Sequence, residues 1–136
     1  MKRRNKMSHH LMRMSYEPKN EAVFSGKCRQ TIRKGRDYAV GDTLEIYESD
    51  GNTPNLATRS VKAKVVEVMP IAITSHGIGT LMWTSRLMDH IAKKDGIDPP
   101  TGIELKRVLE SFYGAFPPEG VEAQIVRWEP LKEDEQ

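Results

Sequence analysis

Cysteine is almost absent from this sequence of 136 residues, since Cys28 is the only one. A lone cysteine can form neither an internal disulfide nor a thiolate metal cluster, and the four histidines do not have the spacing of a metal site. We therefore expect no metal, no other cofactor and a reducing compartment, the cytoplasm.

Long apolar runs are also missing. No stretch approaches the roughly 20 apolar residues of a membrane-spanning helix. The basic start MKRRNKMSHHLMRM is not followed by the apolar core and small-residue cleavage site of a secretory signal. No internal repeat is present. A chain of this length is expected to form a single domain of an intracellular protein that does not enter a membrane, and a monomer is the expected state.

Charge is plentiful and unevenly distributed. Residues 1–36 hold eleven Lys or Arg and two Glu, a net charge of +9, whereas residues 37–136 hold ten Lys or Arg and seventeen Asp or Glu, a net charge of −7. A basic end on a mildly acidic body predicts an anionic partner, with nucleic acid as the first candidate. We interpret residues 1–9 as a basic flexible arm, 10–130 as the folded domain and 131–136 as an acidic frayed tail.

Hydrophobic periodicity predicts more strands than helices. Alternation indicates strands over residues 11–16, 28–33, 43–48, 60–70 and 121–128, and a strand, a bend and a second strand over 71–82. Helices are predicted over 18–25, 85–94 and 101–113, the last opened by a capping box in which Thr101 is the N-cap and Glu104 follows three residues later. Because strands and helices do not alternate, the order indicates a mostly antiparallel, curved or barrel-like sheet with helices at its edge, a mixed α+β fold.

The stretch SGKCRQTIRKGRDYAVGD, residues 25–42, carries the most specific pattern. Gly26 and Arg33 have the spacing of the motif G-x-K-x-x-x-x-R, a Val-Gly-Asp turn precedes the strand at 43–48, and the late helix IELKRVLESFYG precedes the last strand. In this order the features resemble the ASCH domain, a PUA-like family, over residues 10–130. The resemblance implies a PUA-like β-barrel of about six mostly antiparallel strands with two to three helices.

The same resemblance implies a function. Members of the family are thought to bind RNA or nucleotides in a cleft between the barrel and the helices, and some small relatives resemble amidohydrolases that deacylate acetylcytidine with a threonine, a lysine and a carboxylate. By position the threonine is Thr31, and the carboxylate is Asp98, with Asp95 as its neighbour. The motif lysine position holds Cys28, so Lys27 is the candidate substitute.

Alternation along the strand at 28–33 sorts the basic side chains. Ile32 is expected to point into the core, so that Arg29, Thr31 and Arg33 face the cleft. Tyr38 is the aromatic candidate for stacking on a base. The predicted nucleic-acid-binding residues are Lys27, Arg29, Arg33, Lys34, Arg36 and Tyr38.

Structural interpretations compete with these functional ones. Arg33 has Asp42 and Glu45 as candidate ion-pair partners, Thr31 is a β-branched residue that suits a strand, and Cys28 is a candidate buried hydrophobe. Because the motif lysine is absent, we favour binding over catalysis. The expected function is a small intracellular RNA- or nucleotide-binding module with a basic cleft, and the alternative is an amidohydrolase or nuclease acting on modified nucleosides or RNA.

Overall fold

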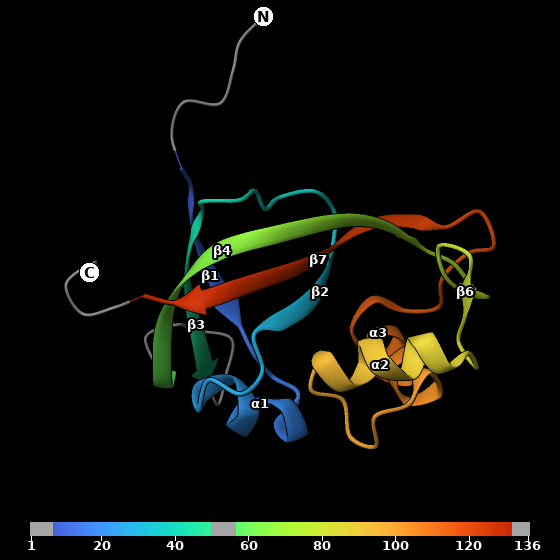
Figure 1. The fold of residues 1–136 in the computed structure, drawn as a ribbon, viewed down its shortest axis with the longest axis horizontal. Helices are drawn as coiled ribbons and strands as arrows, with labels where there is room; N and C mark the ends of the chain where they lie inside the picture. Colours follow the sequence, from blue (N-terminus) through green and yellow to red (C-terminus); the bar gives the residue numbers. More distant parts are fainter. Residues whose placement is uncertain (1–6, 50–56, 132–136) are drawn as a thin grey trace, which may run out of the picture.

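One curled sheet and three helices make up the part of the chain that the computed structural model describes, residues 7–49 and 57–131 (Figure 1). The strands are β1 (His9–Arg13), β2 (Gln30–Lys34), β3 (Thr43–Ser49), β4 (Ala57–Ile73), β5 (Gly77–Ile78), β6 (Leu81–Met82) and β7 (Val121–Pro130). The helices are α1 (Glu17–Phe24), α2 (Arg86–Lys94) and α3 (Gly102–Tyr113).

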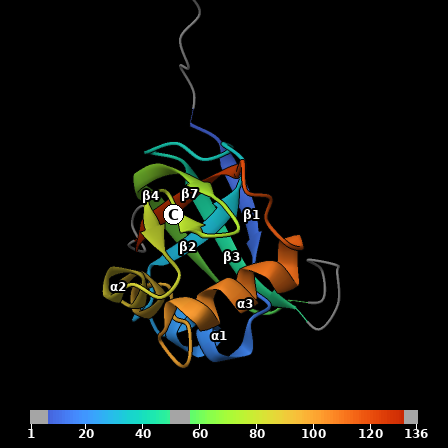
Figure 2. The same cartoon turned by 90° about the vertical axis from the view of Figure 1, so that its right-hand side faces the viewer.

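Strands β4 and β7 form the centre of the sheet. β4 pairs with β3 along its first half and with β7 along its second, and β2 continues the sheet beyond β7. These pairings are antiparallel, whereas β1 runs parallel to β3. The helices lie together along one side of the sheet (Figure 2). The predicted α+β class and the mostly antiparallel, curled sheet are confirmed, with seven strands in the described residues where about six were expected.

The central strand is longer than the sequence pattern predicted. β4 runs without interruption to Ile73, and only then does a bend lead to the short strands β5 and β6. The pairing of β4 with β7 shifts register between Val65 and Glu67, which marks a β-bulge. A bulge bends and twists a strand, and this one lies where β4 passes from the β3 side of the sheet towards the helices.

The buried side chains form two hydrophobic clusters. The first lies among β4, β7 and the helices α2 and α3, and it includes Ile32. The second lies among β1, α1, β3, β4 and β7, and it includes Cys28. Ile32 therefore points into the core as predicted, and Cys28 is the buried hydrophobe of the structural interpretation. Thr31 lies between Cys28 and Ile32 in the sequence, and therefore near the boundary between the two clusters.

The first strand begins at the last residue of the predicted basic arm. β1 begins at His9, one residue before the predicted boundary, and the backbone N–H of Ser8 donates a hydrogen bond to Asp42. Most of the predicted basic arm, residues 1–6, and most of the acidic tail, residues 132–136, lie outside the described residues. None of the helices described is long and apolar enough to cross a membrane.

Candidate functional site

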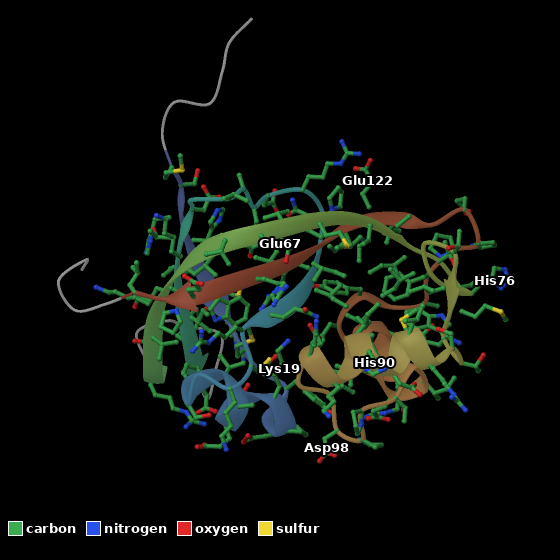
Figure 3. All side chains as sticks on the ribbon, in the orientation of Figure 1. Lys19, Glu67, His76, His90, Asp98 and Glu122 are labelled. Atoms are coloured by element: carbon green, nitrogen blue, oxygen red, sulfur yellow. The ribbon has the colours of Figure 1, made fainter. Side chains whose placement is uncertain are left out.

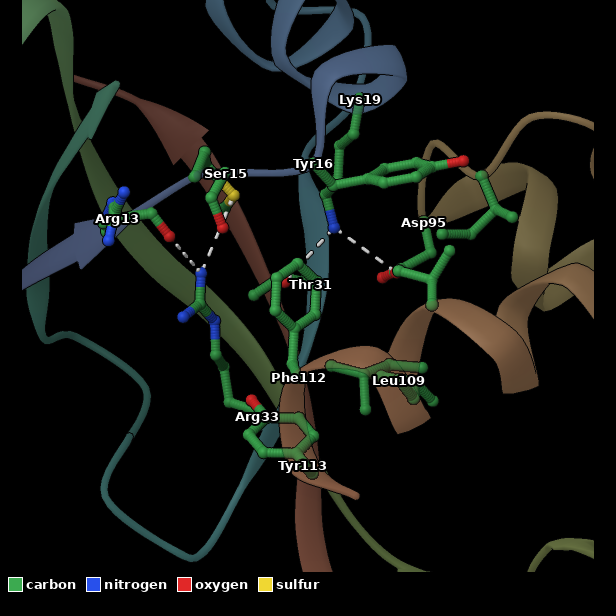
Figure 4. A pocket seen from close by; sticks show the side chains of 14 residues that line it. Arg13, Ser15, Tyr16, Lys19, Thr31, Arg33, Asp95, Leu109, Phe112 and Tyr113 are labelled. Atoms are coloured by element: carbon green, nitrogen blue, oxygen red, sulfur yellow. Dashed lines mark hydrogen bonds and ion pairs between the residues drawn. The ribbon is translucent and has the colours of Figure 1, made fainter. Parts of the chain in front are cut away.

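A pocket of about 240 Å³ opens between strand β2 and helix α3. Its wall combines the segment after β1, the first turn of α1, strand β2, the loop after α2 and the last turns of α3 (Figure 4). The lining residues are Arg13, Met14, Ser15, Tyr16, Lys19, Thr31, Ile32, Arg33, Asp95, Ile97, Val108, Leu109, Phe112 and Tyr113. This position, between the sheet and the helices, is the one that the sequence resemblance predicted for a cleft.

Three buried polar side chains meet in the wall of the pocket. The Nζ of Lys19 donates a hydrogen bond to the Oγ1 of Thr31 at 3.2 Å and lies 3.3 Å from the Oδ2 of Asp95 (Figure 4). Each of the three residues exposes only 3–5% of its surface. An amine held between a hydroxyl and a carboxylate is an arrangement that can activate the hydroxyl as a nucleophile. We call these residues the Lys19–Thr31–Asp95 cluster.

Local structure explains how Lys19 reaches the cluster. Lys19 lies in the first turn of α1, four residues before the buried Val23, and residues four apart share a helical face. Its stem passes close to Gly96, whose φ of +78° favours glycine. A Cβ at Gly96 would lie 3.0 Å from the Lys19 Cγ and 3.2 Å from the Cys28 Sγ. The missing side chain of Gly96 therefore leaves room for the lysine stem.

Burial dominates the electrostatics of Asp95. Its loss of hydration raises the pKa of the Asp95 carboxyl above the usual range, and the Lys19 charge is the main influence that opposes this rise. Burial similarly raises the pKa of the Cys28 thiol, whose Sγ donates a hydrogen bond to the carbonyl oxygen of Lys94 at 3.4 Å. A protonated, buried thiol is a poor nucleophile, so Thr31 is the stronger candidate for covalent chemistry.

Arg33 brings a second cation to the pocket. Its guanidinium donates to the carbonyl oxygen of Arg13 at 2.9 Å and lies 3.6 Å from the Met14 sulfur (Figure 4). Neither candidate partner, Asp42 or Glu45, forms an ion pair with Arg33 within the described residues. Asp42 instead accepts hydrogen bonds from the N–H of Ser8 and of Ala39 and contacts the His10 ring. Arg33 therefore lines the pocket without an ion pair to either of these carboxylates in the described part of the chain.

The other predicted binding residues lie elsewhere. Lys27 and Arg29 line a second pocket on the far side of Cys28. Lys34 and Arg36 are exposed, and Arg36 forms an ion pair with Glu122. The Tyr38 ring is half-buried and packs against the His10 ring, with 4.6 Å between ring centroids. Of the predicted binding set, the structure places only Arg33 in the first pocket.

The predicted catalytic residues are also separated. Thr31 lines the pocket, but Lys27 does not, and the amine that lies beside Thr31 is that of Lys19. The exposed side chain of Asp98 lies outside the pocket, although the backbone of Asp98 exchanges hydrogen bonds with the Tyr16 hydroxyl (Figure 3). Asp95, named in the sequence as its neighbour, supplies the carboxylate.

Among the pocket residues that the sequence did not predict are Lys19 and Phe112, whose signals were weak. Lys19 stands on the apolar side of a short predicted helix, which is an unusual place for a lysine and was the available signal. Phe112 follows the helical spacing of the apolar residues Val108 and Leu109, yet it is 51% exposed at the pocket. In the described part of the chain, no three His, Cys, Asp or Glu side chains gather to hold a metal ion.

Alanine substitutions at two glycines test the packing behind the cluster. Gly96→Ala is expected to lower the free energy of unfolding by about 2–4 kcal/mol, because strain at positive φ adds to overpacking against Lys19 and Cys28. Gly26→Ala is the matched control, since Gly26 also has positive φ, +86°, but a Cβ there meets no atom within 4 Å. Urea denaturation measures both changes. Equal losses for the two variants would show that Gly96 does not make room for Lys19.

Comparison with known proteins identifies the fold. No family model matches the sequence, and no curated protein matches it. The structure is similar to the crystal structure of an ASCH domain from Lactobacillus crispatus JV V101, with a TM-score of 0.62 and 10% sequence identity, over 90% of this chain and 79% of that chain. It also matches the hypothetical protein PH0355, with a TM-score of 0.49 and 17% identity, over 90% of this chain and 99% of that chain. The chain therefore has the ASCH-like fold that its motifs predicted.

Proposed function

We propose that this chain, which has the fold of an ASCH domain, binds RNA or a nucleotide and takes one nucleoside into the first pocket. The observation that carries the proposal is Phe112, an apolar side chain left 51% exposed where it lines the pocket. Tyr16 and Tyr113 line the same pocket. Unstacked bases bind to aromatic faces of this kind, and each base has such a face to offer.

The size and polarity of the pocket agree with a single nucleoside. Its volume of about 240 Å³ is below the range of roughly 300–1,000 Å³ for sites that hold drug-sized ligands. Apolar side chains from α3 form one wall, while Arg33, Lys19 and Thr31 offer hydrogen-bond donors on the other (Figure 4). A bound nucleotide could then place its base between the aromatic side chains and its sugar or phosphate within hydrogen-bonding reach of Arg33.

Support for RNA as the ligand class comes from the family-level likeness. An ASCH-like fold suggests a small RNA-binding module, and the pocket lies between the sheet and the helices, where the sequence resemblance predicted the cleft. Arginine is suited to phosphate because its guanidinium presents several donors in one plane. Arg33 is therefore the first residue of the pocket that we assign to phosphate or base-edge contact.

Removal of the Phe112 ring tests the proposal. Phe112→Ala is expected to weaken the binding of ribonucleoside monophosphates by about 1–3 kcal/mol, because stacking on one aromatic ring is lost. Isothermal titration calorimetry with each of the common ribonucleotides measures the change. Ile103→Ala is the matched control, since Ile103 is an exposed apolar residue of the same helix that does not line the pocket. Absence of nucleotide binding by the unmodified chain, or equal affinities of the two variants, would refute the proposal.

The Lys19–Thr31–Asp95 cluster favours a second candidate, hydrolysis of an acyl group on such a nucleoside. In that reaction Thr31 Oγ1 would attack the acyl carbon and pass its proton to the neutral amine of Lys19. The C–N bond to the base would then break, and the leaving nitrogen would take the proton back from Lys19. Water would release the acyl group from Thr31 as a carboxylic acid.

Asp95 has a defined task in this candidate reaction. Lys19 can accept a proton from Thr31 only as the neutral amine, so the proton of its ammonium form must move to a neighbouring group. Asp95 Oδ2 lies 3.3 Å away, and burial raises the pKa of this carboxyl, which favours its protonated form. The sequence motif supports the same reaction class but has Cys28 at its lysine position, so the candidate depends on Lys19.

A further inference from the structure

A second pocket, of about 370 Å³, collects positive charge beside the first. Five of its lining side chains are basic, and its lining contains no Asp or Glu. They come from three places in the chain: the segment before β2, the C-terminal end of α2, and β7. The five residues are Lys27, Arg29, Lys93, Lys94 and Arg127, and we call this the basic pocket.

Among the described residues, four of these five cations have no ion-pair partner. All five side chains are exposed. Arg127 pairs with Glu67 at 2.8 Å, whereas the other four form no ion pair with any residue of the described chain. Like charges brought together repel one another, and a concave surface of one sign attracts ions of the opposite sign. The basic pocket therefore favours an anionic ligand.

The two pockets are consecutive along the same strand. Residues 28–30 line the basic pocket, and residues 31–33 line the first pocket. The end of α2 and the loop after it divide in the same way, because Lys94 and Gly96 line the basic pocket while Asp95 and Ile97 line the first. Three residues of extended strand span about 10 Å, so one continuous chain of nucleotides can reach both pockets.

We infer that the basic pocket binds the phosphodiester backbone of a single-stranded polynucleotide whose adjoining nucleoside occupies the first pocket. The inference rests on the proposed function and narrows its ligand from a free nucleotide to a strand. A strand fits because the cations are spread over three elements, as in grooves that follow a nucleic-acid backbone. A polyanion of another kind, such as an acidic peptide, lacks the base that the aromatic side chains of the first pocket would stack.

Charge reversal at the end of α2 tests this inference. Lys93→Glu/Lys94→Glu is expected to weaken binding of a labelled single-stranded RNA of about 12 nucleotides by roughly tenfold or more at low salt. The slope of log affinity against log salt should decrease by about 0.7 for each phosphate that the variant no longer neutralises. Fluorescence anisotropy measures both quantities. Affinity for ribonucleoside monophosphates should stay within about twofold, because the first pocket is unchanged.

Two further double variants serve as controls for the charge reversal. Lys62→Glu/Lys64→Glu makes the same change of net charge on exposed residues of β4 that line neither pocket, and it should leave RNA affinity nearly unchanged. Lys93→Gln/Lys94→Gln removes the two cations without placing negative charge at the C-terminal end of a helix, and it should weaken RNA binding in the same direction.

A single-stranded DNA of the same sequence shows whether the phosphodiester backbone alone suffices for binding or the 2′-hydroxyl contributes. Weaker binding of either the RNA or the DNA by the α2 variants supports the inference.

The outcomes separate this inference from the proposed function. If Phe112→Ala weakens RNA binding while the α2 variants match the β4 control, the inference is wrong and the proposed function stands. If the unmodified chain binds a polyglutamate peptide but neither a polynucleotide nor a ribonucleoside monophosphate, both are wrong. Weakened RNA binding by the α2 variants together with unchanged mononucleotide affinity is the result that we expect.

Discussion

Lys19→Met is expected to lower the free energy of unfolding by about 3–5 kcal/mol at neutral pH, the typical cost of removing one partner of a buried ion pair. Lys19 and Asp95 are each almost fully buried, with 3.3 Å between the Lys19 Nζ and the Asp95 Oδ2. Without the ammonium, the carboxylate would remain in an apolar wall with no opposite charge beside it. Urea denaturation at neutral pH measures the loss.

The loss should depend on pH, with a sign that follows from linkage. Burial already raises the pKa of Asp95, and removal of the Lys19 charge raises it further. An acid whose pKa is higher in the folded state binds more protons when folded, so stability falls as pH rises from its unfolded pKa of about 3.9 through its folded pKa. The Lys19→Met variant should therefore be close to wild type near pH 4 and lose stability steadily towards neutral pH.

A double variant supplies the control. Lys19→Met/Asp95→Asn removes both charges, so it should regain most of the lost stability and lose the added pH dependence. An interaction energy between the two sites is expected, because residues in direct contact are not additive. If Lys19→Met costs less than about 1 kcal/mol at every pH, the two side chains are not coupled as the structure indicates.

Thr31→Ala is expected to abolish the turnover of acetylcytidine, by roughly a thousandfold or more, if the second candidate function holds. The lost hydroxyl would act mainly in the transition state, so affinity for the nucleoside should stay within a few-fold. Thr31→Ser keeps a hydroxyl at the same position and should retain measurable turnover. Release of acetate from acetylcytidine by the purified chain measures the rate, with Thr31→Ser beside Thr31→Ala in every assay.

The same variant has a different expected result if the chain only binds. Wild type would then release no acetate, and Thr31→Ala would cost about 0.5–1.5 kcal/mol of nucleotide affinity, the contribution of one hydrogen bond. Turnover by wild type that survives in Thr31→Ala would contradict the assignment of Thr31 as the nucleophile. Measurements on the Thr31 variants therefore distinguish a binding module from an enzyme.

Short-range patterns in the sequence predicted most of the fold. The alternation in residues 43–48 and the capping box at Thr101 each report a local preference of the backbone, and both elements are present. The sequence pattern predicted the long strand β4 only over residues 60–70, with a separate strand from residue 71, whereas β4 runs from Ala57 to Ile73. Its pairing with β7, which extends to Ile73 with one bulge, depends on residues 48 to 67 positions away and leaves no local signal.

Local sequence patterns likewise predicted some residues of the candidate site and not others. Alternation along β2 places Thr31 and Arg33 on one face, and the motif spacing points to the same segment. Lys19 and Asp95 stand 12 and 64 residues from Thr31 in the sequence, and no periodicity relates them to it. Lys27, next to the lysine position of the motif, was the candidate for the amine, but Lys27 lines the basic pocket and not the first pocket.

Composition, turn residues and periodicity thus determined the fold class, the order of the elements, and the pocket-facing positions of Thr31 and Arg33 on β2. Only the tertiary structure decided which amine and which carboxylate meet Thr31. It also decided that Lys27 and Arg29 line the basic pocket, that Arg33 lines the first pocket, and that Lys34 and Arg36 line neither. The physical reason is that periodicity reports which face of an element a side chain occupies, whereas a site is made where faces of different elements meet. That meeting is set by the packing of α1 and α2 around Gly96, through contacts that no local pattern encodes.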